Sequence, residues 1–105
     1  MSEQPLQPDS GAPAKATFFV TGTVQGVGFR WWVKSKGLEL GLVGFARNLD
    51  DRRVEVCAQG EREAVERLGE MLTEKVSSHR RPGRVRHVVT QWGTPRTDLV
   101  GFREL

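Results

Sequence analysis

The sequence has one cysteine, no long apolar run and no basic residue before Lys15. Each of these features argues against a particular class of protein. Cys57 alone can form neither an internal disulfide nor a cysteine-based zinc site, which favours a reducing compartment. No segment approaches the roughly 18 consecutive apolar residues that a membrane span requires. Residues 1–14 hold three of the five prolines and lack the pattern of a signal peptide. We therefore expect a cytoplasmic protein without membrane contact, whose residues 1–14 form a disordered, uncleaved tail.

The rest of the chain, residues 15–105, has the length and composition of one globular domain. The whole sequence has 105 residues, of which 37% are hydrophobic and 28% charged. All 16 Lys and Arg but only 11 of the 13 acidic residues lie in this domain, so its net charge is +5. A basic surface favours anionic ligands, either phosphorylated small molecules or nucleic acid, and does not choose between them.

Hydrophobic periodicity predicts two helices and four main strands in the domain. Alternating and β-branched segments predict strands, apolar residues at spacings of three and four predict helices, and glycine, proline and serine mark the turns. This order of elements is the split βαβ of a ferredoxin-like α+β sandwich, βαββαβ, with two helices on one face of an antiparallel sheet. We expect strands over 16–21, 42–46, 53–58 and 85–92, helices over 29–40 and 61–76, and an edge strand within 99–105.

The segment Gly22–Arg30, Gly-Thr-Val-Gln-Gly-Val-Gly-Phe-Arg, places three glycines between a strand and a helix. Glycines let successive backbone N–H groups converge, the helix N-terminus attracts anions, and the Arg30 guanidinium offers two parallel donors to a phosphate. The spacing fits neither a nucleotide P-loop nor the dinucleotide-binding fingerprint. It predicts an anion-binding turn, although a turn whose glycines serve only close helix-to-sheet packing has the same pattern.

The segment Val24–Arg30, followed by Gly44–Asn48 and then Val54, Val56 and Gly60, resembles the acylphosphatase family over most of the domain. The known fold of that family is the ferredoxin-like sandwich. The resemblance implies hydrolysis of the carboxyl-phosphate bond of acyl phosphates, with a water positioned by Asn48 and with no metal or cofactor. It also implies that phosphate binds to Arg30 and to the backbone of Gly22, Thr23, Val24, Gln25, Gly26, Val27 and Gly28.

This reaction makes modest demands on a protein. The leaving carboxylate has a conjugate acid of pKa about 4, like Asp and Glu side chains, so no general acid is needed. What remains is to stabilise charge on the phosphoryl oxygens and to hold water in line with the bond that breaks. Because an amide is not a base, Asn48 can only orient the water, and the bound phosphate should accept its proton.

Several residues near these motifs have simpler interpretations. Without Arg30 and the glycine-rich turn, Asn48 would be an ordinary hairpin residue. Arg52 occupies the position where the resembled family usually has a turn glycine, which puts the shape of the hairpin in question. Arg47, Arg52 and Arg53 are expected to form a solvated basic rim.

The remaining reactive and aromatic side chains are expected to be structural. His79 and His87 have no partner at metal-ligand spacing and should lie on the surface. Cys57 should pack within the sheet, because no histidine lies near it in the sequence. Of Trp31 and Trp32, one should pack in the core. The other could flank the acyl side of the substrate, but we favour a core or partly exposed filling role for it.

Two other functions compete with this hypothesis. A basic ferredoxin-like domain is also typical of an RNA-binding module, but segment 53–58 lacks the stacking aromatics such a module needs, so we expect no nucleic-acid partner. The chain also resembles the acylphosphatase-like module of hydrogenase-maturation carbamoyltransferases, which would imply carbamoyl phosphate. The lack of zinc-finger cysteines favours a free-standing enzyme acting on a small molecule. Few apolar surface candidates are evident, so we expect a monomer.

Overall fold

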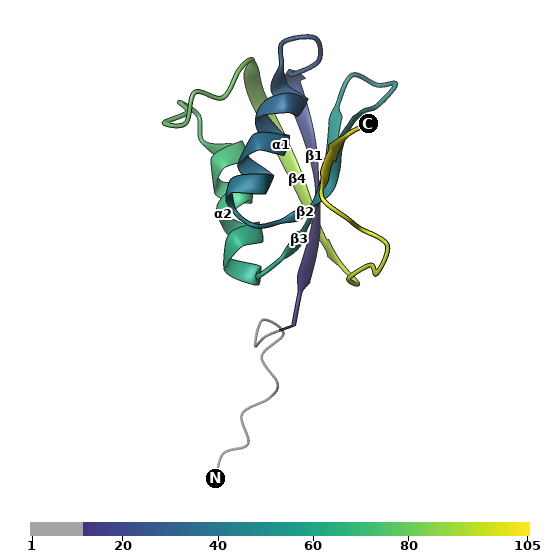
Figure 1. The fold of residues 1–105 in the computed structure, drawn as a ribbon. Helices are drawn as coiled ribbons and strands as arrows, with labels where there is room; N and C mark the ends of the chain where they lie inside the picture. The colour runs from purple at the N-terminus through teal and green to yellow at the C-terminus, as the bar shows by residue number, and fades with distance from the viewer. Residues whose placement is uncertain (1–11) are drawn as a thin grey trace.

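The computed structural model describes residues 12–105, which form two helices and five strands (Figure 1). The expected helices and strands are all present, with boundaries that differ by a few residues. The elements are β1 (Ala14–Thr23), α1 (Phe29–Glu39), β2 (Val43–Asn48), β3 (Val54–Gly60), α2 (Arg62–Thr73), β4 (Arg84–Gly93) and β5 (Phe102–Glu104). Between residues 12 and 105, neither helix is long and apolar enough to cross a membrane.

The start of β1 lies slightly before the domain boundary expected from the sequence. Ala14, the last residue assigned to the tail, pairs with Gly60 of β3 and is itself buried. The strand therefore begins one residue earlier than the expected domain. Residues 1–11 of the expected disordered tail lie outside the described part of the chain.

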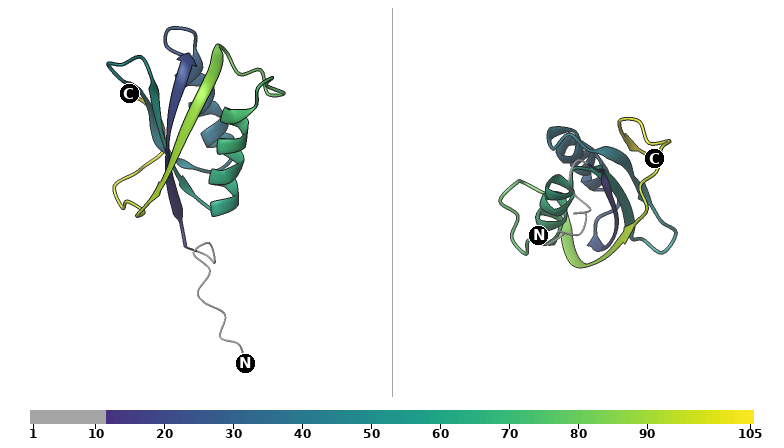
Figure 2. Two further views of the ribbon diagram at one scale, coloured as in Figure 1. Left: turned by 180° about the vertical axis from the view of Figure 1, so that it is seen from behind. Right: turned by 90° about the horizontal axis from the view of Figure 1, so that it is seen from below.

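The strands form one sheet in the order β4-β1-β3-β2-β5, and both helices cover the same face of it (Figure 2). Adjacent pairs among the first four strands are antiparallel, which confirms the ferredoxin-like α+β fold. The short β5 departs from the expected antiparallel sheet, because it pairs parallel to β2 with Phe102 opposite Gly44. After β4 the chain crosses to the opposite edge of the sheet, where the reversed direction of β5 matches that of β2. The sheet is therefore mixed.

The core lies between the sheet and the two helices. Alternate residues of β1 and β3 face the helices, so the side chains of Phe18, Val20 and Val56 are almost completely buried. Burial of apolar surface at about 25 cal/mol per Å² is the main stabilising term for such a layer. Gly37 lets α1 approach β5 closely, since a Cβ there would lie 2.4 Å from the ring of Phe102. The packing of α1 thus positions both the loop before it and the last strand.

Cys57 lies on the opposite face of the sheet from the core and is nonetheless buried. The segment between β4 and β5 covers this region, where the Gln59 amide donates to the Arg96 carbonyl oxygen at 2.8 Å. Burial raises the pKa of the Cys57 thiol, which keeps it protonated and weakly nucleophilic. The packing role expected for Cys57 agrees with this position.

Arg81 closes the C-terminal end of α2, a role the sequence did not suggest. Its Nη1 donates to the carbonyl oxygens of Met71 and Leu72 at 2.9 and 3.2 Å. Its Nη2 donates to the carbonyl oxygen of Glu74 at 2.7 Å. Burial of this guanidinium lowers its pKa, and the charge lies at the negative end of the helix dipole.

We expect Arg81→Ala to destabilise the fold by about 2–4 kcal/mol, because it leaves helix-end carbonyl oxygens buried without donors. Urea denaturation monitored by circular dichroism measures this change. Arg80→Ala is the matched control, since Arg80 is the exposed neighbour and should change stability by less than about 0.5 kcal/mol. Equal losses in the two variants would contradict the capping role.

Candidate functional site

The loop between β1 and α1, residues 24–28, brings the expected anion-binding turn to one end of the sheet. Gly26 and Gly28 have φ values of 76° and 86°, a region that side-chain-bearing residues rarely adopt. Gly28 is the N-cap of the 11-residue α1, and no side chain caps that end of the helix. The first N–H groups of α1 are therefore available to an anion, together with the positive end of the helix dipole.

A small hollow of about 70 Å³ lies beside this loop, and we call it the loop hollow. Arg30 and Trp31 at the start of α1 form one wall, and Glu104 of β5 forms another. Trp31 is 62% exposed, whereas Trp32 is buried and its Nε1 donates to the His79 carbonyl oxygen. Trp32 therefore packs in the core, as expected for one of the two, while Trp31 is largely exposed beside the hollow. The lining residues are Val24, Gly26, Gly28, Phe29, Arg30, Trp31 and Glu104.

One hydrogen bond joins the Arg30 side chain to Leu105, the residue that follows β5. Its Nη1 donates to the Leu105 carbonyl oxygen at 2.5 Å, and the Leu105 N–H donates to the Ala46 carbonyl oxygen at 2.9 Å. Arg30 makes no other hydrogen bond to residues 12–105, so most of its donors remain available to a ligand. The contact places the guanidinium beside β2, on the side where β5 ends.

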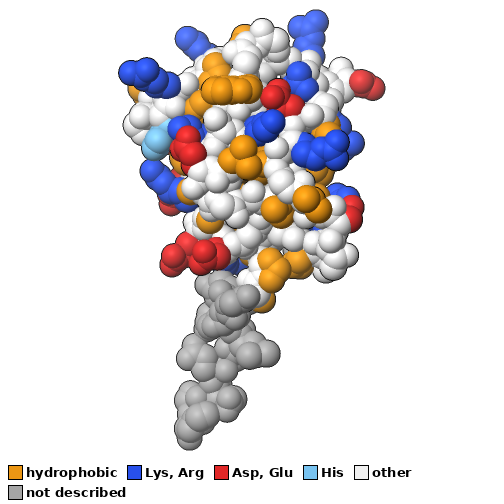
Figure 3. Space-filling model, in the orientation of Figure 1, with side chains coloured by type: hydrophobic (Ala, Val, Ile, Leu, Met, Phe, Trp, Pro, Cys, Tyr) orange, Lys and Arg blue, Asp and Glu red, His pale blue; other side chains and the backbone are white. Residues whose placement is uncertain are grey.

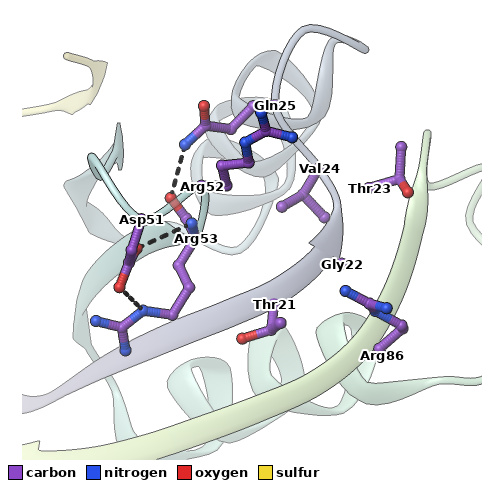
Figure 4. A pocket seen from close by; sticks show the side chains of 9 residues that line it. All are labelled: Thr21, Gly22, Thr23, Val24, Gln25, Asp51, Arg52, Arg53 and Arg86. Atoms are coloured by element: carbon purple, nitrogen blue, oxygen red, sulfur yellow. Dashed lines mark hydrogen bonds and ion pairs between the residues drawn. The ribbon is translucent and has the colours of Figure 1, made fainter.

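The Gln25 side chain fastens the loop to the turn between β2 and β3. Its Nε2 donates to the Leu49 carbonyl oxygen at 2.9 Å. It also donates to the Arg53 carbonyl oxygen at 3.0 Å (Figure 4). From the sequence we expected only the backbone of Gln25 to contribute to the anion-binding turn, and this side-chain contact was missed. No local pattern reveals it, because the acceptors lie 24 and 28 positions along the chain.

Asn48 is the last residue of β2 and directly precedes the turn that Gln25 holds. It pairs with Val54 of β3, and its side chain is exposed without a hydrogen bond to any described residue. Asn48 does not line the loop hollow. The hydrogen bonds of Gln25 therefore bring the loop close to the end of β2, which carries Asn48. Val27, another residue of the expected phosphate-binding segment, lines neither of the two hollows beside the loop.

A larger hollow of about 460 Å³ lies on the other side of Val24, and we call it the arginine pocket (Figure 4). Basic side chains on the helix-bearing face also gather toward this end of the sheet (Figure 3). The first four residues of the expected phosphate-binding segment line this pocket, and of these only Val24 also lines the loop hollow. Its lining residues are Thr21, Gly22, Thr23, Val24, Gln25, Asp51, Arg52, Arg53 and Arg86.

The turn between β2 and β3 keeps the shape that a glycine would favour, although Arg52 occupies the position. Arg52 has a φ of 75°, and its N–H donates to the Leu49 carbonyl oxygen at 3.1 Å. Asp51 supports the turn by accepting the Arg53 N–H at 3.1 Å and its Nε–H at 2.7 Å. These bonds, the backbone one first, hold the pKa of Asp51 below its usual value.

The surface position expected for His87 agrees with the structure, and that expected for His79 agrees only in part. His87 on β4 is exposed, whereas His79 is half-buried beside Glu74 and Arg67. Across residues 12–105, no group of three or more His, Cys, Asp or Glu side chains is arranged to hold a metal ion.

Comparison with known proteins identifies the family. The family model described as acylphosphatase matches residues 16–104. An acylphosphatase of Nocardia farcinica is 51% identical over 104 residues, which cover 99% of both chains. One from Thermobifida fusca is 53% identical over 90 residues, covering 86% of this chain and 94% of the relative. The solved structure of an acylphosphatase from Coxiella burnetii superimposes with a TM-score of 0.78 at 31% identity, covering 95% of this chain and all of that one. The chain therefore belongs to the acylphosphatase family.

Proposed function

We propose that the β1–α1 loop and Arg30 hold the phosphoryl group of an acyl phosphate while Asn48 orients the attacking water. Family membership shows that this is an acylphosphatase enzyme, which hydrolyses acyl phosphates. The roles of the individual residues are our proposal. The observation that carries it is the loop hollow, where an uncapped helix start and a largely unpaired arginine meet.

The loop hollow offers two kinds of donor to a phosphoryl group. Backbone N–H groups of the loop and of the first turn of α1 are fixed by the chain, so they need no reorganisation when charge develops on the phosphoryl oxygens. The Arg30 guanidinium adds a charged, two-pronged donor. Because the transition state of phosphoryl transfer spreads negative charge over the oxygens that do not react, both kinds of donor stabilise it.

Water attack needs only orientation, and the end of β2 is a suitable place for it. Asn48 has a free amide at the edge where the Gln25 contact brings the turn toward the loop. The amide oxygen can accept a hydrogen bond from a water and so direct the water's lone pair at phosphorus. The leaving carboxylate departs without protonation, and the phosphoryl oxygens accept the proton of the water. No metal or cofactor enters this mechanism.

We expect Arg30→Ala and Asn48→Ala each to lower kcat/KM for benzoyl phosphate by about 10²-fold or more, because each removes a preorganised charge or water contact. Steady-state hydrolysis assays measure this loss. Arg47→Ala is the control, since Arg47 neighbours Asn48 but points its guanidinium to Glu55 and Phe45. Wild-type rates in either test variant would refute the assignment.

We expect Gln25→Ala to lower kcat/KM about 10-fold, because the loop loses its two bonds to the turn and with them part of its preorganisation. Gln59→Ala is a matched control, since Gln59 makes an analogous pair of 2.8 Å bonds to Arg96 in the β4–β5 connection. Both variants should lose stability in urea, but only Gln25→Ala should lose activity. A parallel loss of kcat/KM in both would show that Gln25 acts through general stability alone.

We expect hydrolysis of benzoyl phosphate to be unaffected by a chelator and competitively inhibited by inorganic phosphate. The reason is that the proposed donors are amides and a guanidinium, and a phosphate ion fits the same donors as the phosphoryl group. Assays with and without EDTA, and across a phosphate series, measure both effects. Loss of activity with EDTA that added metal restores would overturn the metal-free mechanism.

A further inference from the structure

The arginine pocket lies next to the loop hollow and is not the space in which the proposed mechanism places the reacting phosphoryl group. Val24 lines both spaces, so the same loop separates them. We propose that the arginine pocket is a second oxyanion site, which binds a phosphate or carboxylate group other than the phosphoryl group that reacts. The group belongs either to the acyl part of the substrate or to a free phosphate ion. This inference rests on the proposed function only if the anionic group belongs to the acyl part of the substrate.

The pocket holds positive charge that its own acidic residue does not neutralise. Asp51 is already paired with Arg53, at 2.7 Å between Oδ2 and Nε. Arg53 is further fixed by stacking over the Phe19 ring at 5.0 Å. Arg52 and Arg86 form no ion pair with any residue from 12 to 105. Two guanidinium groups therefore remain to attract an anion.

Arg52 and Arg86 reach the pocket from different elements. Figure 4 shows Arg52 coming from the β2–β3 turn and Arg86 from β4, with Val24 and Gly22 between them. The pairing of β1 with β4 shifts between Thr21 and Gly22, which leaves Arg86 as the extra residue of a bulge. A bulge redirects a side chain relative to a regular strand, and it occurs often beside functional sites.

The backbone of Arg52 is a second, independent observation. A non-glycine residue at a φ of 75° costs about 1–2 kcal/mol relative to a favourable conformation. A glycine at this position would avoid that cost. Here the strained position instead directs a cationic side chain into the pocket. Residues in such conformations cluster at active sites and ligand-binding positions.

The size of the pocket fits a ligand group beyond the reacting phosphate. It encloses about 460 Å³, compared with about 70 Å³ for the loop hollow. Thr21 and Thr23 hydroxyls line it and make no side-chain hydrogen bond within residues 12–105, so they can also donate to an anion. An acyl phosphate with a second anionic group could occupy both spaces, whereas a free phosphate would occupy the pocket alone.

The first part of the test compares two substrates, benzoyl phosphate and 4-carboxybenzoyl phosphate, which differ by one carboxylate. The measured quantity is the ratio of kcat/KM for the carboxylated substrate to that for benzoyl phosphate. We expect Arg52→Gln/Arg86→Gln to lower this ratio about 10-fold, mainly through KM, if the acyl part supplies the anion. The control Arg67→Gln/Arg80→Gln removes two charges elsewhere, one of them also at a positive φ of 57°, and should leave the ratio within about twofold.

The second part needs no turnover, so it remains informative even if benzoyl phosphate is not hydrolysed. Inorganic phosphate is titrated into ¹⁵N-labelled protein, and amide shifts are followed. If free phosphate is the ligand, Thr21 and Thr23 should saturate on a different curve from Gly26 and Gly28. The Thr21 and Thr23 shifts should disappear in Arg52→Gln/Arg86→Gln and persist in the Arg67→Gln/Arg80→Gln control.

A positive result in either part supports the site and identifies the source of its anion. The proposal is overturned if the substrate ratio changes equally in the test and control variants, or in neither, and the Thr21 and Thr23 shifts are absent or insensitive to both substitutions. Failure of the proposed function would appear differently, as wild-type hydrolysis of benzoyl phosphate by Arg30→Ala or Asn48→Ala.

Discussion

The docking of the β1–α1 loop onto the β2–β3 turn is the contact on which the site depends. The loop contains two glycines with positive φ, and its conformation would be weakly determined by its own sequence. The Gln25 amide fixes it by bonding to two turn carbonyl oxygens at 2.9 and 3.0 Å. One side chain thus couples the backbone donors proposed for phosphate to the strand end that carries Asn48. Donors held in place before the reaction stabilise developing charge without a cost of reorganisation.

Most of the fold could be predicted from the sequence because it follows from local patterns. Periods of two and of three to four residues identified the main strands and both helices. The parallel pairing of β5 with β2 could not be predicted, since it brings together residues far apart in the chain, such as Gly44 and Phe102, after the chain has crossed to the opposite edge of the sheet. The cap that Arg81 provides for α2 was missed for the same reason, because its acceptors lie seven to ten positions earlier in the chain.

The same distinction applies to the site: its local patterns could be predicted from the sequence, and its contacts between distant residues could not. The glycine spacing and Arg30 are contiguous in sequence, so the anion-binding turn could be predicted from them, while Asn48 required the resemblance to the family. The contacts of Gln25 with Leu49 and of Arg30 with Leu105 span 24 and 75 positions and leave no local signal. The sequence raised the question of Arg52, and the structure answers it: the turn keeps a glycine-like φ with an arginine in place.

The most direct test of the central claim is a crystal structure of the protein grown or soaked in sulfate, a tetrahedral oxyanion that is not hydrolysed. The account predicts density in the loop hollow, within hydrogen-bond distance of the loop amides and of the Arg30 guanidinium. An empty loop hollow in crystals where sulfate binds elsewhere on the molecule would contradict it.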